Sequence, residues 1–221
     1  MTKQEMRNFI AKRTAKFFND GDVVNLGIGM PTLCLEHLPE GVDIWIESEN
    51  GVLGLAGAPE NEADGDIDIV DASGSVSTMR PGGCCFSSFD SFGLIRGGHV
   101  DAAVLGTLQV DQEGNIANWI VPGKVAPGMG GAMDLCSGVK RIIVASEHCE
   151  KNGESKIKKR CTLPLTGAKC VTDIVTEKCY FQVTPEGLVL KEIAEGLTVE
   201  DIRACTDADF VVADDLCTMV G

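Results

Sequence analysis

The stretch Glu47-Ser48-Glu49-Asn50-Gly51-Val52-Leu53-Gly54 joins two short apolar runs through a dipeptide, Asn50-Gly51, that commonly forms a sharp turn. The simplest interpretation is a β-hairpin with a type I′ turn and two solvated acids. A carboxylate at the end of a strand, on a tight turn, can also be held rigidly and still reach a cleft. The stretch therefore predicts a strand–turn–strand unit and makes Glu49 a candidate for catalysis.

Outward from this stretch, short apolar runs alternate with turns and helix-like segments. The expected strands lie at 23–26, 43–47, 67–70, 100–106, 140–146, 171–176 and 210–212, with hairpin-like strands at 180–183 and 188–190. The expected helices lie at 3–19, capped by Thr2 and Glu5, at 31–39, at 87–95 (a short helix or a lid) and at 198–205. We expect 57–98 to be largely irregular with a turn at 80–83, and 109–119 to be a polar excursion.

This order of elements is typical of an α/β protein. It predicts an open, mostly parallel sheet with helices on both faces and some hairpin additions, in a single domain spanning 1–221. The 221 residues and the 44% apolar content are sufficient for a full core. No apolar run approaches the roughly 18 residues of a membrane span, and no apolar signal segment is present at the N-terminus. We therefore expect a cytoplasmic protein that does not bind membranes.

The charge and the metal-ligating residues exclude several classes of function. A net charge of −14 argues against a nucleic-acid partner. The basic cluster 156–160 is expected to be a solvated loop, although it or a partner chain would have to supply cations to a polyanionic ligand. The ten cysteines include no Cys-x-x-Cys pair, so no metal site is expected, and most should be small buried hydrophobes. His37, His99 and His148 are scattered and are interpreted as structural.

Two glycine-rich turns remain as candidate ligand sites. Gly27-Ile28-Gly29 follows a strand, and Glu47 lies twenty residues after Gly27, so the region partly matches a dinucleotide-binding fingerprint. Thr32 replaces the third glycine and the following helix is short, which favours a turn that offers backbone amides to an acyl group or phosphate. The second turn, at 128–135, is either a plain helix entry or an oxyanion hole. A carboxylate with such amide clusters suits acyl transfer through a covalent intermediate.

The same residues resemble a known family. Ser48-Glu49-Asn50-Gly51 with 52–54 resembles the active-site signature of family I CoA-transferases, in the β subunit or C-terminal half of the 3-oxoacid and butyrate–acetoacetate type. Further segments resemble that family in the same order, namely 25–32, 91–92, 95–101, 128–135 and 161–167. The chain departs from the signature at Glu47, where the family usually has Gln or His. A second carboxylate beside the nucleophile can raise the pKa of that nucleophile.

The resemblance implies a ping-pong transfer of CoA between a short-chain acyl-CoA and a carboxylic acid or 3-oxoacid such as acetoacetate. Glu49 would attack the acyl-CoA and then carry CoA as a glutamyl thioester. The backbone amides of Gly130 and Gly131 are the candidate oxyanion donors, with Gly130 preferred. The other candidate binding residues are Asn50, which would orient Glu49, and Gly27 and Gly29.

The resemblance also implies a partner and leaves alternatives open. A separate α subunit should complete the site, in an α2β2 heterotetramer, with CoA esters as substrates and no permanently bound cofactor or metal. The acid pair stays open among acetoacetate, acetate, butyrate, succinate and 3-oxoadipate. The alternatives are a nicotinamide-dependent oxidoreductase and a non-catalytic acyl-CoA-binding subunit on the same fold.

Overall fold

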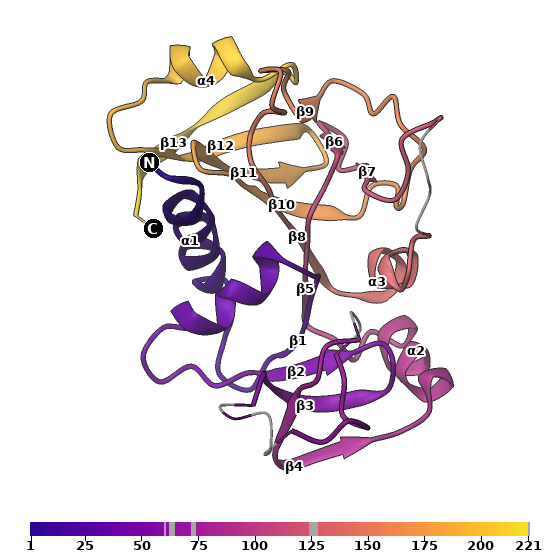
Figure 1. The fold of residues 1–221 in the computed structure, drawn as a ribbon. Helices are drawn as coiled ribbons and strands as arrows, with labels where there is room; N and C mark the ends of the chain where they lie inside the picture. The colour runs from indigo at the N-terminus through magenta and orange to yellow at the C-terminus, as the bar shows by residue number, and fades with distance from the viewer. Residues whose placement is uncertain (60, 62–64, 72–73, 124–127, 221) are drawn as a thin grey trace.

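A computed structural model describes residues 1–59, 61, 65–71, 74–123 and 128–220. Its main feature is a ten-stranded mixed sheet in the order β13-β12-β11-β10-β8-β5-β1-β2-β3-β4 (Figure 1). The strands are β1 Val23–Leu26, β2 Trp45–Ser48, β3 Val52–Gly57, β4 Thr78–Cys85, β5 Ala102–Leu105, β8 Arg141–Ala145, β10 Val171–Val175, β11 Cys179–Thr184, β12 Gly187–Ala194 and β13 Phe210–Met219. The helices are α1 Lys3–Ala15, the 3₁₀ helix η1 Met30–His37, α2 Ser88–Arg96, α3 Ala132–Gly138 and α4 Val199–Cys205.

The predicted α/β class is confirmed, and the parallel part of the sheet is its centre. Strands β2, β1, β5, β8 and β10 pair in parallel, whereas β3 and β4 at one end and β11 and β12 at the other add antiparallel pairs. Strands β5 and β8 were predictable because their middles are continuously apolar, as strands covered on both faces require. β5, for example, is buried at all four positions.

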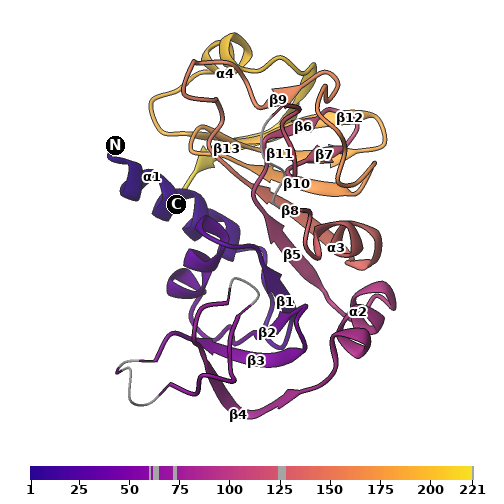
Figure 2. The ribbon, with the colours of Figure 1, turned by 45° about the vertical axis from the view of Figure 1, so that its right-hand side comes forward.

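The two faces of this sheet carry separate cores. Ala103 and Leu105 of β5 belong to the cluster that also contains residues of α2 and α3, while Ala102 and Val104 belong to the cluster that contains residues of α1. Successive side chains of a strand point to opposite faces, so one short strand serves both cores. Figure 2 shows α1 on one side of β5 and β8 and α3 on the other.

Several predicted elements have different limits in the structure. α1 has the predicted capping box between Thr2 and Glu5, but it ends at Ala15 because the chain tightens there into i→i+3 hydrogen bonds such as Phe17 N–H to the Thr14 carbonyl. The strand expected at 67–70 is reduced to a single bridge between Val70 and Val76. The strand expected at 210–212 continues through all ten residues of β13.

The turn predicted at 80–83 is wrong, because these residues form the middle of β4. β4 is the last strand of the sheet and pairs only with β3 among the described strands, with register shifts on the way. A proline has no N–H to donate, so Pro81 is compatible with an edge strand and not with a central one. Glycine and proline obscured the strand in the sequence because they occur where the pairing is irregular.

A second, three-stranded sheet contains two segments that were predicted as loops. It consists of β6 Gln109–Asp111, β7 Ile116–Ala117 and β9 Ile157–Lys158, in the order β7-β6-β9. The basic cluster 156–160 is therefore not a solvated loop. Ile157 is buried, and Lys158 and Lys159 form ion pairs with Asp207 and Asp209.

The order of the central strands also marks a place for a ligand. After β1 the chain adds β2 on one side of it and then returns to add β5 on the other, so the topology reverses at β1. Open α/β sheets bind ligands outside the carboxyl ends of their strands at such a reversal. Gly27 lies there, with its N–H bound to the Val104 carbonyl at 2.9 Å, and Glu49 follows the neighbouring strand β2. Within the described residues, no helix is long and apolar enough to cross a membrane.

Candidate active site

Glu49 lies on the three-residue connection between β2 and β3. The two strands pair Glu47 with Leu53 and Ser48 with Val52, and the Gly51 N–H donates to the Ser48 carbonyl at 2.9 Å. The hairpin is as predicted, but the type I′ turn is wrong, because that turn needs positive φ at both Asn50 and Gly51 and only Gly51 has it, at 113°. The connection is thus one residue longer than a type I′ loop, with Glu49 as its first residue.

The half-buried carboxylate of Glu49 has different neighbours on its two oxygens. The Asn25 side-chain amide, from β1, donates to Glu49 Oε2 at 3.2 Å. The other oxygen faces Gly131, the N-cap residue of α3, because a Cβ atom at Gly131 would lie 3.1 Å from Oε1 and 2.9 Å from Glu49 Cγ. Glu49 is therefore held between a side-chain amide on one side and bare backbone on the other.

Glu47, two residues earlier, is almost completely buried and shares the same amide. Asn25 Nδ2 donates to Glu47 Oε2 at 2.8 Å, and the buried Ser91 hydroxyl of α2 donates to Glu47 Oε1 at 2.6 Å. Burial raises the pKa of the Glu47 carboxyl above its usual 4.5, the hydrogen bonds from Ser91 and Asn25 oppose this rise, and the charge of Glu49 adds to it. The site thus contains two carboxylates in contrasting environments.

Both carboxylates line a cavity of about 570 Å³ at the carboxyl ends of β1 and β2. Its apolar wall includes Leu35, Ile46 and Leu55, while Gly29 and the exposed Ile28 form part of its rim. No Lys or Arg is among its described lining residues. Arg7 of α1 lies just outside, with its guanidinium 3.7 Å from the position of a Cβ atom on Gly29. The cavity can therefore accept an acyl chain, but it offers little positive charge.

Comparison with known proteins settles the family. A sequence model described as "Coenzyme A transferase" matches residues 7–204. This chain belongs to the coenzyme A transferase family.

The relatives include β-type chains of near-equal length. The chain is 54% identical to the beta subunit of the acetate CoA-transferase of Haemophilus influenzae over 214 residues, covering 96% of this chain and 95% of that protein. It is 45% identical to one subunit of a probable succinyl-CoA:3-ketoacid coenzyme A transferase of Bacillus subtilis, covering 95% and 97%. It therefore corresponds to the β-type subunit of a CoA-transferase.

The solved structures agree on the fold. A crystal structure of an acyl-CoA transferase apoenzyme from Escherichia coli O157:H7 has a TM-score of 0.76 and 22% sequence identity. The match covers 97% of this chain and 43% of that longer chain, so this CoA-transferase subunit corresponds to less than half of it.

Some of the residues expected in the site of this CoA-transferase subunit lie near Glu49, and others do not. Gly131 lies against Glu49, and Gly130 precedes it with φ of 53° and open space where a Cβ atom would lie. Gly29 lines the cavity, while Gly27 packs against the Val104 carbonyl. Asn50 points elsewhere, because its amide donates to the Val70 carbonyl at 2.9 Å. The residues near 124–127, ahead of the second glycine turn, lie outside the described part of the chain.

Sequence reasoning missed Asn25 and Ser91. Asn25 is a polar residue in the otherwise apolar run 23–26, and this exception was the available signal. It reaches Glu49 because β1 and β2 are parallel neighbours that pair Asn25 with Glu47. Asn25 and Ser91 both lie within segments that resemble the family, but nothing in the local sequence connects either of them to Glu47.

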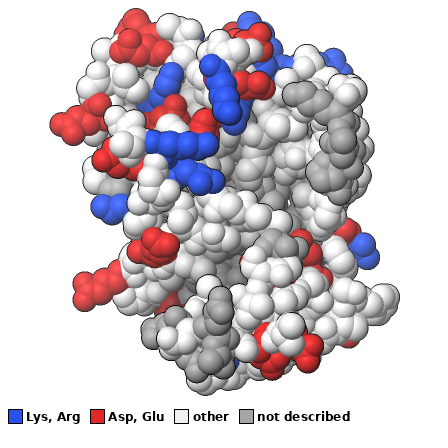
Figure 3. Space-filling model, in the orientation of Figure 1, with Lys and Arg blue, Asp and Glu red and all other residues white. Residues whose placement is uncertain are grey.

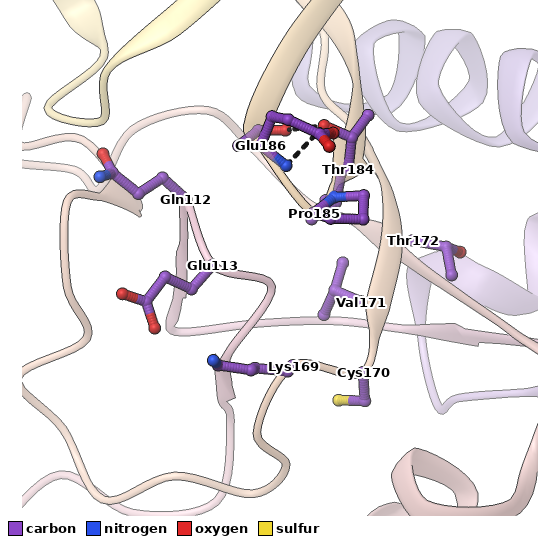
Figure 4. A pocket seen from close by; sticks show the side chains of 11 residues that line it. Gln112, Glu113, Lys169, Cys170, Val171, Thr172, Thr184, Pro185 and Glu186 are labelled. Carbon is purple, nitrogen blue, oxygen red and sulfur yellow. Dashed lines mark hydrogen bonds between the residues drawn. The ribbon is translucent and has the colours of Figure 1, made fainter.

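A second cavity of about 620 Å³ lies elsewhere and includes none of these residues (Figure 4). It is formed near the β6–β7 turn and the β11–β12 turn, where Glu113, Lys169 and Glu186 are part of its lining. Its volume is slightly larger than that of the Glu49 cavity, but no pair of its charged groups resembles the arrangement around Glu49. The candidate site is therefore the smaller cavity, which Glu49 lines.

The histidines and cysteines lie apart from this site or have structural surroundings. His148 is buried, with its ring nitrogens 3.0 Å from Thr176 Oγ1 and 2.9 Å from Thr206 Oγ1, and burial followed by the charge of Lys178 lowers its pKa to about 4. The expectation that most cysteines are buried is wrong. Only Cys34, Cys136 and Cys179 are, whereas Cys84, Cys85 and Cys217 are exposed on the edge strands β4 and β13. No group of described His, Cys, Asp or Glu side chains could hold a metal ion.

Proposed function

We propose that this chain is the catalytic subunit of a CoA-transferase that exchanges CoA between a short-chain acyl-CoA and a carboxylic acid, with Glu49 as the nucleophile. The observation that carries the proposal is the position of the Glu49 carboxylate, which opens to the cavity between the Asn25 amide and the Gly131 backbone. Covalent catalysis by a carboxylate replaces one difficult displacement with two easier ones.

In the first step, Glu49 Oε1 attacks the thioester carbon of the acyl-CoA. A C–O bond forms, the C–S bond breaks, and CoA leaves as a thiolate with the electron pair, so that Glu49 becomes a mixed anhydride. Oε1 is the attacking atom because Oε2 is already bound to Asn25. The negative charge that develops on the acyl oxygen is assigned to the backbone amides of Gly130 and Gly131, which directly precede α3.

In the second step, the CoA thiolate attacks Glu49 Cδ. A C–S bond forms and the bond from Cδ to Oε1 breaks, so the first acid leaves with Oε1 as part of its carboxylate. The charge that develops on Oε2 meets the Asn25 N–H that already binds this atom. The second acid then repeats both steps in reverse and leaves as its CoA ester. Asn25 is therefore assigned to stabilise the charge that develops when Glu49 Cδ is attacked. The glycine turn is assigned to stabilise the charge that develops when the acyl carbon is attacked.

The lining of the cavity supports a short monocarboxylic acid as a substrate. One part of its wall is apolar, and its described acids include Glu36 and Asp71, with no described Lys or Arg to pair with a second substrate carboxylate. One relative is named as an acetate CoA-transferase and another for succinyl-CoA and a 3-ketoacid, so acetate, succinate and 3-oxoacids are the candidate substrates. We assign acetate and short 3-oxoacids such as acetoacetate, with succinate disfavoured. Initial rates against a panel of acids of two to six carbons test this assignment.

A separate α subunit is part of the proposal. The phosphates of CoA need cations. On the face in Figure 3, Lys and Arg gather mainly over the upper part of the molecule, among Asp and Glu, whereas the few charged side chains over the part that holds β2 to β4 are mostly Asp and Glu. The relatives named as beta subunits support a partner chain. We assign an α2β2 assembly. The mass of the co-expressed complex, measured by native mass spectrometry, tests its composition.

The deciding experiment is to trap CoA on Glu49. The co-expressed complex is incubated with acetyl-CoA alone and digested, and the peptide that contains residue 49 is weighed. We expect an added CoA on that peptide, its absence in Glu49→Ala, and a fall in kcat/KM of roughly a thousandfold or more in that variant. Normal transfer by Glu49→Ala contradicts the proposal.

The alternatives make different predictions. A nicotinamide site would use Glu47 for the ribose, but that carboxylate is buried and already bound by Asn25 and Ser91, and η1 is shorter than a crossover helix. A non-catalytic acyl-CoA-binding subunit would bind acetyl-CoA without exchanging labelled acetate into it. Exchange of label by the wild-type complex and not by Glu49→Ala separates that alternative from the proposal.

A further inference from the structure

Two carboxylates share one amide nitrogen at the base of the Glu49 cavity. Asn25 Nδ2 has two hydrogens, and it donates to Glu47 Oε2 at 2.8 Å and to Glu49 Oε2 at 3.2 Å. No positively charged side chain is hydrogen-bonded to either carboxylate among the contacts of the described residues. The two negative charges are therefore held close together without a cation between them.

The two carboxylates differ in what the reaction does to them. Glu49 changes its charge during the proposed cycle, since an ionised carboxylate becomes a neutral thioester. Glu47 is almost fully buried and makes no bond to substrate in that cycle. Because charges in a buried site are screened little by water or salt, the charge on Glu47 acts on Glu49 through the short distance between them.

We propose that Glu47 is a positioning residue whose negative charge raises the free energy of ionised Glu49 and so drives formation of the enzyme–CoA thioester. This inference rests on the proposed function of Glu49. In the net half-reaction, ionised Glu49 and an acyl-CoA give the thioester and a free carboxylate, so one negative charge leaves the site with the released acid. That transfer relieves the repulsion from Glu47, and the equilibrium constant of the half-reaction is correspondingly larger.

The surroundings of Glu47 accommodate both of its protonation states. When Glu47 is ionised, the Ser91 hydroxyl donates to it at 2.6 Å. When Glu47 is protonated, it can donate to Ser91 Oγ, whose own hydrogen then turns to the Ser48 carbonyl at 3.3 Å. The groups that face Glu47 are Asn25 from β1, Ser91 from α2 and Glu49 from the hairpin, so Glu49 is the ionisable group among them.

The direction of the pH effect follows from this coupling. The pKa of Glu47 is raised by burial and further by the charge of Glu49, and the second cause disappears in the thioester. Thioester formation therefore releases protons from Glu47 at a pH near its raised pKa. The half-reaction equilibrium constant should rise with pH through that range and then level off.

The test measures, by intact mass, the fraction of the co-expressed complex that carries CoA. The ratio of acetyl-CoA to acetate is fixed, and the pH is varied above about 5.5, where acetate stays ionised. In Glu47→Gln, which keeps the shape and both hydrogen-bonding positions, we expect an equilibrium constant about tenfold lower at high pH and no dependence on pH. The matched control is Glu195→Gln, an exposed carboxylate on the loop after β12. It should behave as wild type.

A second variant keeps the test decisive if Glu47→Gln folds poorly. Ser91→Ala removes the hydroxyl that stabilises ionised Glu47, so the pH at which the wild-type constant rises should move upward, while the plateau at high pH stays. A merely structural role would lower activity without moving this midpoint. An unchanged constant and pH profile in both variants overturns the inference and leaves the proposed function intact. A wild-type complex that never carries CoA overturns the proposed function itself.

Discussion

Asn25 is the residue on which both carboxylates of the site depend. It is buried, with 2% of its surface exposed, and it stands in a strand whose other residues are apolar. One N–H binds Glu47 and the other binds Glu49. In the proposed mechanism the second bond also meets the charge that develops when CoA attacks Glu49. A hydrogen bond to a charged group contributes about 1.5–3 kcal/mol, so the loss of this amide has a measurable cost in rate.

We predict that Asn25→Ala lowers kcat/KM by roughly 10- to 150-fold, the range that corresponds to one such charged hydrogen bond. The decrease should appear mainly in kcat, because the bond strengthens as the transition state forms. Asn50→Ala provides the comparison, since the Asn50 amide binds the Val70 carbonyl instead of Glu49. Steady-state kinetics of the two variants give the answer. A larger loss in Asn50→Ala would return the orienting role to Asn50, the residue to which the family resemblance gives it.

At this scale, the sequence alone makes Glu49 a candidate nucleophile but does not identify the side chains that hold it. Glu49 could be proposed from its own stretch, because a strand and an Asn-Gly turn surround it. Asn25 and Ser91 belong to other elements and reach Glu47 only after β1 pairs with β2 and α2 packs behind them. Contacts of this kind depend on the register of strands and helices, which no local pattern specifies.

The glycine turn before α3 is the element that approaches Glu49 from the other side. Gly131 has φ of −78° and ψ of −3°, values that an alanine adopts without strain. Glycine is required at this position because of limited space and not because of backbone conformation. A Cβ atom would lie 2.9 Å from Glu49 Cγ and 3.1 Å from Cδ. At Gly130 the backbone conformation favours glycine, because its φ is positive, whereas the space for a Cβ atom is open.

We predict that Gly131→Ala displaces the Glu49 side chain and lowers kcat by roughly a hundredfold, as misplacement by about 1 Å can do. The melting temperature should change little, because the weaker preference of an N-cap for alanine is offset by the smaller conformational entropy that alanine gives the unfolded chain. Thermal unfolding and kinetics on the same sample measure both quantities. A variant that melts far below wild type would show that the turn supports the fold, and one with normal kcat would separate the turn from catalysis.

Among the elements, prediction was most reliable for the central strands of the large sheet. The central strands β5 and β8 were predictable because continuous apolar runs fit strands that are covered on both faces. β4 was missed because an edge strand can contain proline and glycine without losing many of its pairs. The strands of the small sheet are mostly buried, but each is only two or three residues long, which is too short for an alternating pattern to be recognised. The tolerance of edge strands for exposed residues also explains why the exposed cysteines lie on β4 and β13.

The whole molecule has an unequal distribution of charge for an enzyme that handles CoA. Its net charge is −14, and the lysines at 158 and 159 are engaged by Asp207 and Asp209. The described lining of the Glu49 cavity contains no cation, and Arg7 is the nearby exception beside Gly29. Three phosphate groups would therefore enter a region of mainly negative potential unless another chain contributes cations.

We predict that the isolated chain forms little thioester when it is incubated with acetyl-CoA, and that addition of the α subunit restores it. In the complex, KM for acetyl-CoA should increase between about 50 and 200 mM salt while kcat stays nearly constant, because screening weakens the attraction of phosphates to exposed cations and leaves the buried carboxylates unaffected. Arg7→Gln distinguishes the source of the cations. If the α subunit supplies them, this variant changes KM by no more than about threefold, as the loss of one surface charge should. If the isolated chain already forms the thioester and Arg7→Gln abolishes it, the phosphates are held by α1 of this chain, and the partner has another role.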